Sequence, residues 1–430
     1  MMNKKNISSY LWPFILVTCC FALWGFANDI TNPMVKSFSR IFRMSVTDGA
    51  LVQVAFYGGY FAMAFPAAMF IRKHSYKSGL LIGLTLYAIG ALMFIPAAGT
   101  GNYYPFLIAY FILTCGLSFL ETSANPFILS LGDRANATRR LNLAQSFNPI
   151  GSLAGMWVAM NFIQARMNPL GTAERAVLPD AEFEALKSAD LSVVVKPYVA
   201  IGLVILVLFV LMMFAKMPKA KKTGVHDLRL RSTLGRLWRN AIYRYGVIAQ
   251  FFYVGAQITC WTFIIQYGTQ VFMADGMGEQ AAEIASQRLN ILAMILFCAS
   301  RFICTWLMKY FKPVRMLTVF AAIAAVLVLV IILIGGRLGL YSLVGVSAFM
   351  SLMFPTIYGL ALDDVGDDTE IGSAGLIMAI LGGSLLPPLQ ALIIDYGHME
   401  LSFVVPLICF VVVFIYALII DHNEKILQNT

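Results

Sequence analysis

Long apolar runs recur from one end of this chain to the other. A helix that crosses a bilayer needs about 20 apolar residues, because the hydrocarbon offers its backbone no other hydrogen-bond partner. The runs therefore predict an all-α membrane protein in which twelve helices cross the bilayer. We expect these spans near residues 11–35, 50–71, 79–98, 103–131, 141–165, 197–215, 246–272, 289–308, 313–335, 338–362, 371–394 and 401–420.

The composition agrees with a membrane protein. Of the 430 residues, 12% are charged, whereas soluble proteins carry about 25%. The seven cysteines all fall inside spans, and their odd number argues against a disulfide framework. The first span is longer than the apolar core of a signal peptide and lacks a small-x-small cleavage site, so we expect it to remain as a helix.

Basic residues gather on one side of the predicted membrane. Twenty-one of the 31 Lys and Arg residues fall on the side of the N-terminus, 9 fall on the opposite side, and Arg301 lies inside a span. Because positive loops stay in the cytoplasm, both termini are expected there, in a multi-pass protein of the cell inner (plasma) membrane. This pattern explains the net charge of +9 without a nucleic-acid partner.

A basic segment at 219–244 divides the spans six and six. It predicts an N-terminal six-helix half (1–218), a cytoplasmic linker and a C-terminal six-helix half (245–430). Transporters built from two such repeats bind substrate between them at the membrane midplane. We expect the external segment 166–196 and the acidic run 363–370 to be solvated loops, and the acidic run can pair with nearby basic loops.

Glycines are frequent in two of the spans. Small residues let membrane helices approach closely, so these glycines predict tight helix packing. A gating hinge or close approach to a substrate is the alternative. The residues are Gly151, Gly155, Gly372, Gly375, Gly382 and Gly383.

Two carboxylates lie inside the spans, Asp29 and Glu121. A carboxylate at the bilayer centre costs roughly 2.5 to 3.5 kcal/mol and usually marks an ion or proton path. Glu121 has eighteen nearly all apolar span residues before it and ten after it, which predicts a deep position. Since burial disfavours the charged form, Glu121 is expected to take up and release a proton. A hydrogen bond between helices is the structural alternative.

Asp29 belongs to a polar cluster in the first span. Asn28, Asp29 and Asn32 lie on neighbouring parts of one helix face, and Pro33 frees a backbone carbonyl near them. We interpret Asp29 as a second proton-coupling candidate, with Asn28 and Asn32 as substrate-binding candidates. Alternatively, the cluster lies in water at the outer end of the helix.

Amide and aromatic side chains supply further sugar-binding candidates. Amides both donate and accept hydrogen bonds, which suits the hydroxyls of a sugar, and an aromatic ring can serve as its platform. Hydrogen bonding between helices is the alternative for the amides. The candidates are Asn125, Gln145, Asn148, Gln257 and Trp261.

Arg301 is the remaining charged residue inside a span. It can bind substrate, pair with a carboxylate, or extend its head group to the cytoplasm. We keep it as a substrate-binding candidate.

The chain carries no sequence signature of an enzyme. Its four histidines fall outside the span interiors, and there is no metal-spaced cluster and no phosphate-binding glycine loop. We therefore expect neither catalysis nor a metal nor a cofactor, with a proton as the coupling ion.

Two motifs carry a family resemblance: Leu-Glu-Thr-Ser-Ala-Asn-Pro-Phe at 120–127 and Arg-Leu-Asn-Leu-Ala-Gln-Ser-Phe-Asn at 140–148. Further similar stretches lie at 21–28, 53–67, 252–261 and 349–356. On these residues the chain resembles the fucose:proton symporters of the major facilitator superfamily. The resemblance implies a twelve-helix facilitator fold and uptake of a hexose with a proton.

The resemblance also implies roles for particular residues. The glutamate of the family's fourth helix falls on Glu121, and the amides of its fifth helix fall on Gln145 and Asn148. The family's aspartate in helix 1 is Asn32 here, and its asparagine three residues earlier is Asp29, so the two groups are exchanged on one helix face.

We therefore interpret the chain as a proton-coupled monosaccharide importer that works by alternating access, with L-fucose as the first expectation. A symporter for another hexose, such as glucose or galactose, and a non-transporting membrane sugar sensor are the alternatives. Its expected partners are a small sugar and the lipid bilayer, and we expect a monomer.

Overall fold

The computed structural model describes residues 4–31, 33–44, 46–49, 51–170, 172–217 and 230–429. Within these ranges every regular element is a helix. Eleven helical stretches there are long and apolar enough to cross a membrane, and each overlaps one of the predicted spans.

The fifth predicted span, 141–165, is not a continuous helix. Helix α8 (Ala137–Gln145) ends before α9 (Asn148–Val158) begins, and a π-helical turn, η2 (Ala159–Ile163), follows α9. Pro149 lies in the first turn of α9, where its missing N–H leaves no hydrogen bond unmade and its fixed φ favours a helix start.

Contacts divide the chain into two compact units. The first unit comprises residues 1–131 and 147–222, and the second comprises 132–146 and 223–430. The short segment 132–146 thus groups with the C-terminal part of the chain. Of the predicted linker, residues 219–229 lie outside the described residues, and 230–239 form helix α12.

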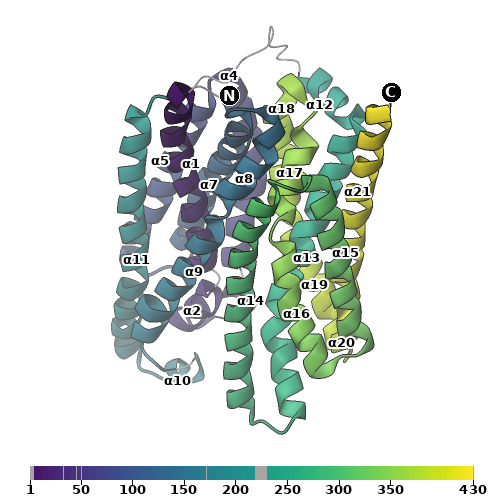
Figure 1. Cartoon of the computed structure of the whole chain (residues 1–430). Helices are drawn as coiled ribbons and strands as arrows, with labels where there is room; N and C mark the ends of the chain where they lie inside the picture. The colour runs from purple at the N-terminus through teal and green to yellow at the C-terminus, as the bar shows by residue number, and fades with distance from the viewer. Residues whose placement is uncertain are drawn as a thin grey trace. The chain divides into compact units, whose positions relative to one another are not determined.

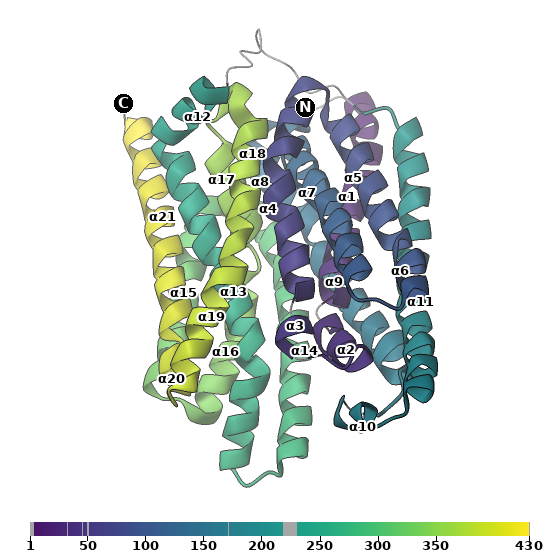
Figure 2. The same cartoon turned by 180° about the vertical axis from the view of Figure 1, so that it is seen from behind.

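The long helices of the first unit run roughly parallel or antiparallel to one another, and the short helices α2, α3 and α10 do not follow this direction (Figures 1 and 2). The helices of this unit are α1 (Lys4–Thr31), α2 (Met34–Ile41), α3 (Val46–Gly49), α4 (Leu51–Lys73), α5 (Tyr76–Leu92), α6 (Phe94–Thr100), α7 (Tyr104–Ser130), α9, η2, η3 (Gln164–Arg166), α10 (Thr172–Ala176) and α11 (Asp180–Phe214).

The second unit is a similar bundle (Figures 1 and 2). Its helices are η1 (Arg134–Asn136), α8, α12 (Leu230–Arg239), α13 (Ala241–Ala274), α14 (Glu279–Leu307), α15 (Pro313–Leu333), α16 (Gly336–Met350), α17 (Met353–Leu362), η4 (Gly366–Asp368), α18 (Thr369–Met378), η5 (Ala379–Leu381), α19 (Gly382–Asp395), α20 (Met399–Ser402) and α21 (Val404–Asn429).

Glycines bring helices into close contact in both units, as the sequence predicted. A Cβ added at Gly151 would lie 1.8 Å from the carbonyl oxygen of Ala22, and one at Gly155 would lie 2.6 Å from that of Phe26. In the second unit, a Cβ at Gly382 would lie 2.0 Å from the Phe251 carbonyl oxygen. The packing interpretation is therefore confirmed for these residues.

Segment 166–196 is not a loop as expected, because it contains α10 and the first part of α11. Arg175 of α10 and Asp190 of α11 form an ion pair of 2.6 Å with almost no exposed surface. Arg175 also donates to the Leu170 carbonyl, and Asp190 accepts from the backbone N–H of Asn168. The folded segment supplies these backbone partners, and they let two charges remain buried.

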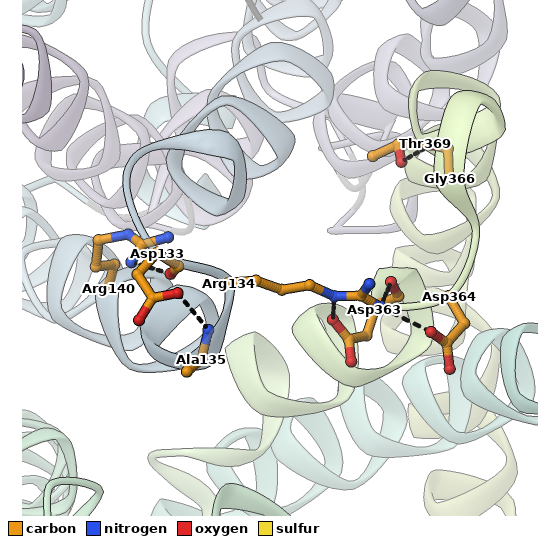
Figure 3. Close-up of polar contacts among 8 residues, drawn as sticks. All are labelled: Asp133, Arg134, Ala135, Arg140, Asp363, Asp364, Gly366 and Thr369. Atoms are coloured by element: carbon orange, nitrogen blue, oxygen red, sulfur yellow. Dashed lines mark hydrogen bonds and ion pairs between the residues drawn. The ribbon is translucent and has the colours of Figure 1, made fainter. Parts of the chain in front are cut away.

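The acidic run 363–370 pairs with basic residues, as expected. Arg134 contacts both Asp363 and Asp364 (Figure 3), and these side chains are more than half exposed. Its hydrogen bond and attraction to Asp363 raise the pKa of the Arg134 guanidinium. Asp368 differs, because its side chain is 7% exposed and accepts from Arg236 of α12 at 2.7 Å. Part of the run is therefore buried rather than solvated.

Candidate functional site

The candidate residues fall into one group in each unit. The first unit holds Asn28, Asp29, Glu121, Asn125 and Asn148, and the second holds Gln145, Gln257, Trp261 and Arg301. Asn32 lies outside the described residues.

Glu121 lies in the most buried stretch of α7. The side chains from Leu113 to Ile128 are all buried, and Glu121 itself is 2% exposed. Neither carboxyl oxygen has a hydrogen-bond partner among the described residues. The predicted deep position is confirmed, and within that part of the chain Glu121 does not form the hydrogen bond that the structural alternative required.

Two tyrosines of α4 lie beside the two candidate carboxyl groups. The Tyr60 hydroxyl is close enough to Glu121 for an electrostatic interaction. The Tyr57 hydroxyl is likewise close enough to Asp29. Sequence reasoning missed both tyrosines. The available signal was their spacing in Tyr57-Gly-Gly-Tyr60, since residues three apart share one face of a helix.

Asn28 and Asp29 lie close to the C-terminal end of α1, and both are half-buried. Full solvation, the alternative for this cluster, therefore does not describe them. Pro33 is the N-cap residue of α2, which begins at Met34.

The two remaining amides of the first unit have different surroundings. Asn125 is completely buried on α7, one turn beyond Glu121. Asn148 begins α9, and its Nδ2 donates to the Phe21 carbonyl of α1 at 3.2 Å. Asn148 thus forms the interhelical hydrogen bond that the sequence left as an alternative to sugar binding.

Arg301 of α14 is held by backbone oxygens of the second unit. Its Nη1 donates to the Gln145 carbonyl at 3.0 Å, and its Nε donates to the Ser351 carbonyl. Its guanidinium lies 4.6 Å from the centroid of the Phe297 ring. Because the residue is 3% exposed, it does not extend its head group into water.

Trp261 forms a polar and aromatic face with its neighbours. Its indole Nε1 donates to Ser347 at 3.2 Å, and its ring meets Phe297 edge-on with centroids 4.9 Å apart. Phe297 therefore lies between Trp261 and Arg301, a relation that sequence spacing did not reveal. Gln257, one turn earlier on α13, is half-buried like Trp261.

The two groups have different chemical capacities. The first can take up a proton on a carboxyl group in apolar surroundings. The second offers a fixed cation, an amide and aromatic faces, which suit a polyhydroxylated ligand. Within the described ranges, no cluster of three or more His, Cys, Asp or Glu residues could hold a metal ion.

Comparison with known proteins adds family information. The family model for the Major Facilitator Superfamily matches residues 17–380. The L-fucose-proton symporter of Haemophilus influenzae is 48% identical, covering 96% of this chain and 98% of that protein. The L-fucose-proton symporter of Escherichia coli is 35% identical, with 95% and 93% covered. The glucose/galactose transporter of Brucella abortus is 30% identical, with 97% and 95% covered.

Solved structures match over similar lengths. A Major Facilitator Superfamily transporter, FucP, in its outward conformation superposes with a TM-score of 0.85 at 35% identity, covering 95% of this chain and 98% of that one. The proton:xylose symporter XylE superposes with a TM-score of 0.68 at 13% identity, with 96% and 95% covered. The second match concerns the fold alone.

Proposed function

This chain belongs to the Major Facilitator Superfamily and, within it, to the fucose:proton symporters, and we propose that it imports L-fucose together with a proton by alternating access. The observation that carries the coupling is Glu121, a buried carboxyl group without a hydrogen-bond partner in the described part of the chain.

The surroundings of Glu121 support a role in proton transfer. An ionised carboxylate that is buried and unpaired is strongly disfavoured, so this conformation favours the neutral, proton-carrying group. The proton leaves when a conformational change gives the carboxylate water or a hydrogen-bond donor. Alternating access supplies such a change, which couples proton release to sugar movement.

The second unit supplies several of the sugar contacts in this proposal. Gln257, Trp261 and Arg301 provide hydrogen-bond donors, an acceptor and an aromatic surface in the second unit. Two of the five N–H donors of Arg301 bond to carbonyls, so others remain for sugar hydroxyls. Gln145 and Asn148 are further contacts that the family resemblance supports.

We propose L-fucose rather than another hexose because the more similar of these relatives are named as L-fucose symporters. The two relatives named as L-fucose symporters are 48% and 35% identical, and the Brucella transporter named for glucose and galactose is 30% identical. We also propose that the protein acts as a monomer, needs no cofactor besides the proton, and lies in the inner membrane with both termini in the cytoplasm.

The test is uptake by purified protein in proteoliposomes. Labelled L-fucose, glucose and galactose are compared with and without an imposed pH gradient. We expect the gradient to drive accumulation of L-fucose above its equilibrium level, with little accumulation of the other two. Accumulation of glucose or galactose instead would show that this sugar, and not L-fucose, is the substrate. Uptake that does not depend on the gradient would reject proton coupling.

A further inference from the structure

Tyr60 carries a buried hydroxyl group that the proposed mechanism has not yet used. The residue is 4% exposed, and its hydroxyl donates to none of the described residues. The hydroxyl interacts with the side chain of Trp24 of α1. Because an indole N–H only donates, Trp24 cannot accept the hydroxyl proton. The Tyr60 O–H donor therefore lacks an acceptor within the described part of the chain.

Glu121 presents the complementary deficiency. Once the group has lost its proton, both of its carboxyl oxygens can accept, and both lack a donor among the described residues. The Tyr60 hydroxyl and the Glu121 carboxyl are close enough for electrostatic interaction. A donor without an acceptor thus lies near two acceptors without a donor, in the same apolar interior.

The backbone fixes the relative level of the two side chains. Ser118 of α7 donates to the backbone carbonyl of Tyr60 at 3.1 Å. Glu121 follows Ser118 by three residues, or about one helical turn. Since α4 and α7 are tied at this level, a side-chain rotation could bring hydroxyl and carboxyl together without sliding the helices.

The other ionisable groups beside Tyr60 do not fill this role. They are Tyr57 and Tyr87. The Tyr87 hydroxyl already donates to the Leu23 carbonyl at 2.9 Å, and Tyr57 lies toward Asp29. Among the described residues, no basic side chain interacts with Glu121 or Tyr60.

Leaving buried polar groups unpaired is unfavourable, so a pair that is unmet in one conformation is a candidate for pairing in another. We propose that the Tyr60 hydroxyl donates a hydrogen bond to the Glu121 carboxylate once that group has released its proton. Tyr60 keeps its own proton, and the transported proton leaves Glu121. Tyr60 is thus a positioning residue that stabilises the deprotonated state. This role rests on the proposed function of Glu121 in coupling.

The test removes the hydroxyl with Tyr60→Phe and measures two activities of the full chain in proteoliposomes. One is L-fucose accumulation driven by a pH gradient, and the other is L-fucose exchange without a gradient. Hydrogen bonds to charged groups are worth enough to change an equilibrium about tenfold or more. We therefore expect gradient-driven accumulation to fall about tenfold, while exchange stays near the parental rate.

Tyr87→Phe is the matched control, because it also removes a buried tyrosine hydroxyl from the first unit. It leaves the Leu23 carbonyl without its donor, so it should lower the melting temperature while leaving the ratio of accumulation to exchange unchanged. Tyr60→Phe also removes a partner, the hydroxyl that interacts with the Trp24 indole N–H, so its melting temperature should fall no further than that of Tyr87→Phe, while only Tyr60→Phe should lower the ratio of accumulation to exchange. A role of Tyr60 in folding alone would lower the melting temperature and leave this ratio unchanged, which would overturn the proposal.

The Glu121→Gln background separates this inference from the proposed function. Without a carboxylate, Tyr60→Phe should have no additional effect on exchange or accumulation. If Glu121→Gln abolishes accumulation and Tyr60→Phe leaves it intact, the inference about Tyr60 is wrong and the function of Glu121 stands. If Glu121→Gln itself keeps full accumulation, the proposed coupling is wrong, and the role of Tyr60 fails with it.

Discussion

Glu121 in the first unit and Arg301 in the second are both charged residue types buried among apolar helices, but their surroundings are opposite. Arg301 donates to two carbonyl oxygens and lies over an aromatic ring. Glu121 has no hydrogen-bond partner among the described residues. A buried charge with several partners is stable in one state, whereas a buried carboxyl without them is suited to change its protonation. In the function that we propose, the second unit therefore supplies a constant charge and the first unit a switchable one.

The largest expected effect comes from removing the switchable group. Glu121→Gln keeps the shape of the side chain but cannot release a proton, so gradient-driven L-fucose accumulation should be abolished while exchange persists. Labelled uptake into proteoliposomes measures both activities. The control is Glu184→Gln, which alters an exposed acidic residue of the same unit and should change neither. Full accumulation by Glu121→Gln would show that Glu121 is not a switchable charge and that the contrast with Arg301 does not explain coupling.

Asp29→Asn tests whether the first unit uses a second carboxylate. We expect impaired proton-driven uptake, and partial recovery when Asn32→Asp is added. On one helix, residues 29 and 32 would lie about 4.5 Å apart along the axis, so the added carboxylate could reach the same space. The same uptake assay decides the question. An active single mutant would remove Asp29 from the coupling path.

Replacing the constant charge should affect stability as well as binding. Arg301→Met leaves the carbonyls of Gln145 and Ser351 without their donor, so we expect a loss of about 1 to 3 kcal/mol in the free energy of unfolding and weaker L-fucose binding. Thermal unfolding and binding calorimetry measure the two effects.

Arg301→Lys is the conservative companion to that substitution. A lysine ammonium cannot reproduce the planar fork that bonds two carbonyls, so Arg301→Lys should rescue little of the lost stability. Parental stability and affinity in this mutant would show that the charge matters and the two-carbonyl geometry does not.

The smallest effect is expected at an exposed pair. Arg134→Ala removes contacts to Asp363 and Asp364, whose side chains are well exposed, and pairs of this kind are worth about 0 to 1 kcal/mol. Arg236→Ala should cost more, because it leaves the buried Asp368 carboxylate without its guanidinium partner. Thermal unfolding of the two mutants gives this ranking, and equal losses would contradict it.

The burial of Glu121 and the close helix contacts at glycines could be predicted from the sequence, because both depend on neighbouring residues in one helix. The depth of Glu121 follows from the apolar residues that flank it in α7. The close contacts at Gly151 and Gly155 follow from the preference of membrane helices for small residues at interfaces. Both features belong to single helices and need no knowledge of the partner helix.

The remaining features depend on which distant residues meet. The carbonyl partners of Arg301 belong to Gln145 and Ser351, which are 156 and 50 residues away. The position of Tyr60 beside Glu121 depends on the alignment of α4 with α7, and the Arg175–Asp190 pair depends on how segment 166–196 folds. Helix packing decides each of these, and one sequence contains no direct signal for it.

The glycine contacts between α1 and α9 limit which motions the transport cycle can use. With backbone against backbone at Gly151 and Gly155, no side chains separate the two helices, and Asn148 and Ser152 add hydrogen bonds across the same seam. Sliding one helix along the other would break all of these contacts together. The two helices should therefore move as one rigid body, so that spin labels on α1 and α9 keep a constant separation throughout the cycle.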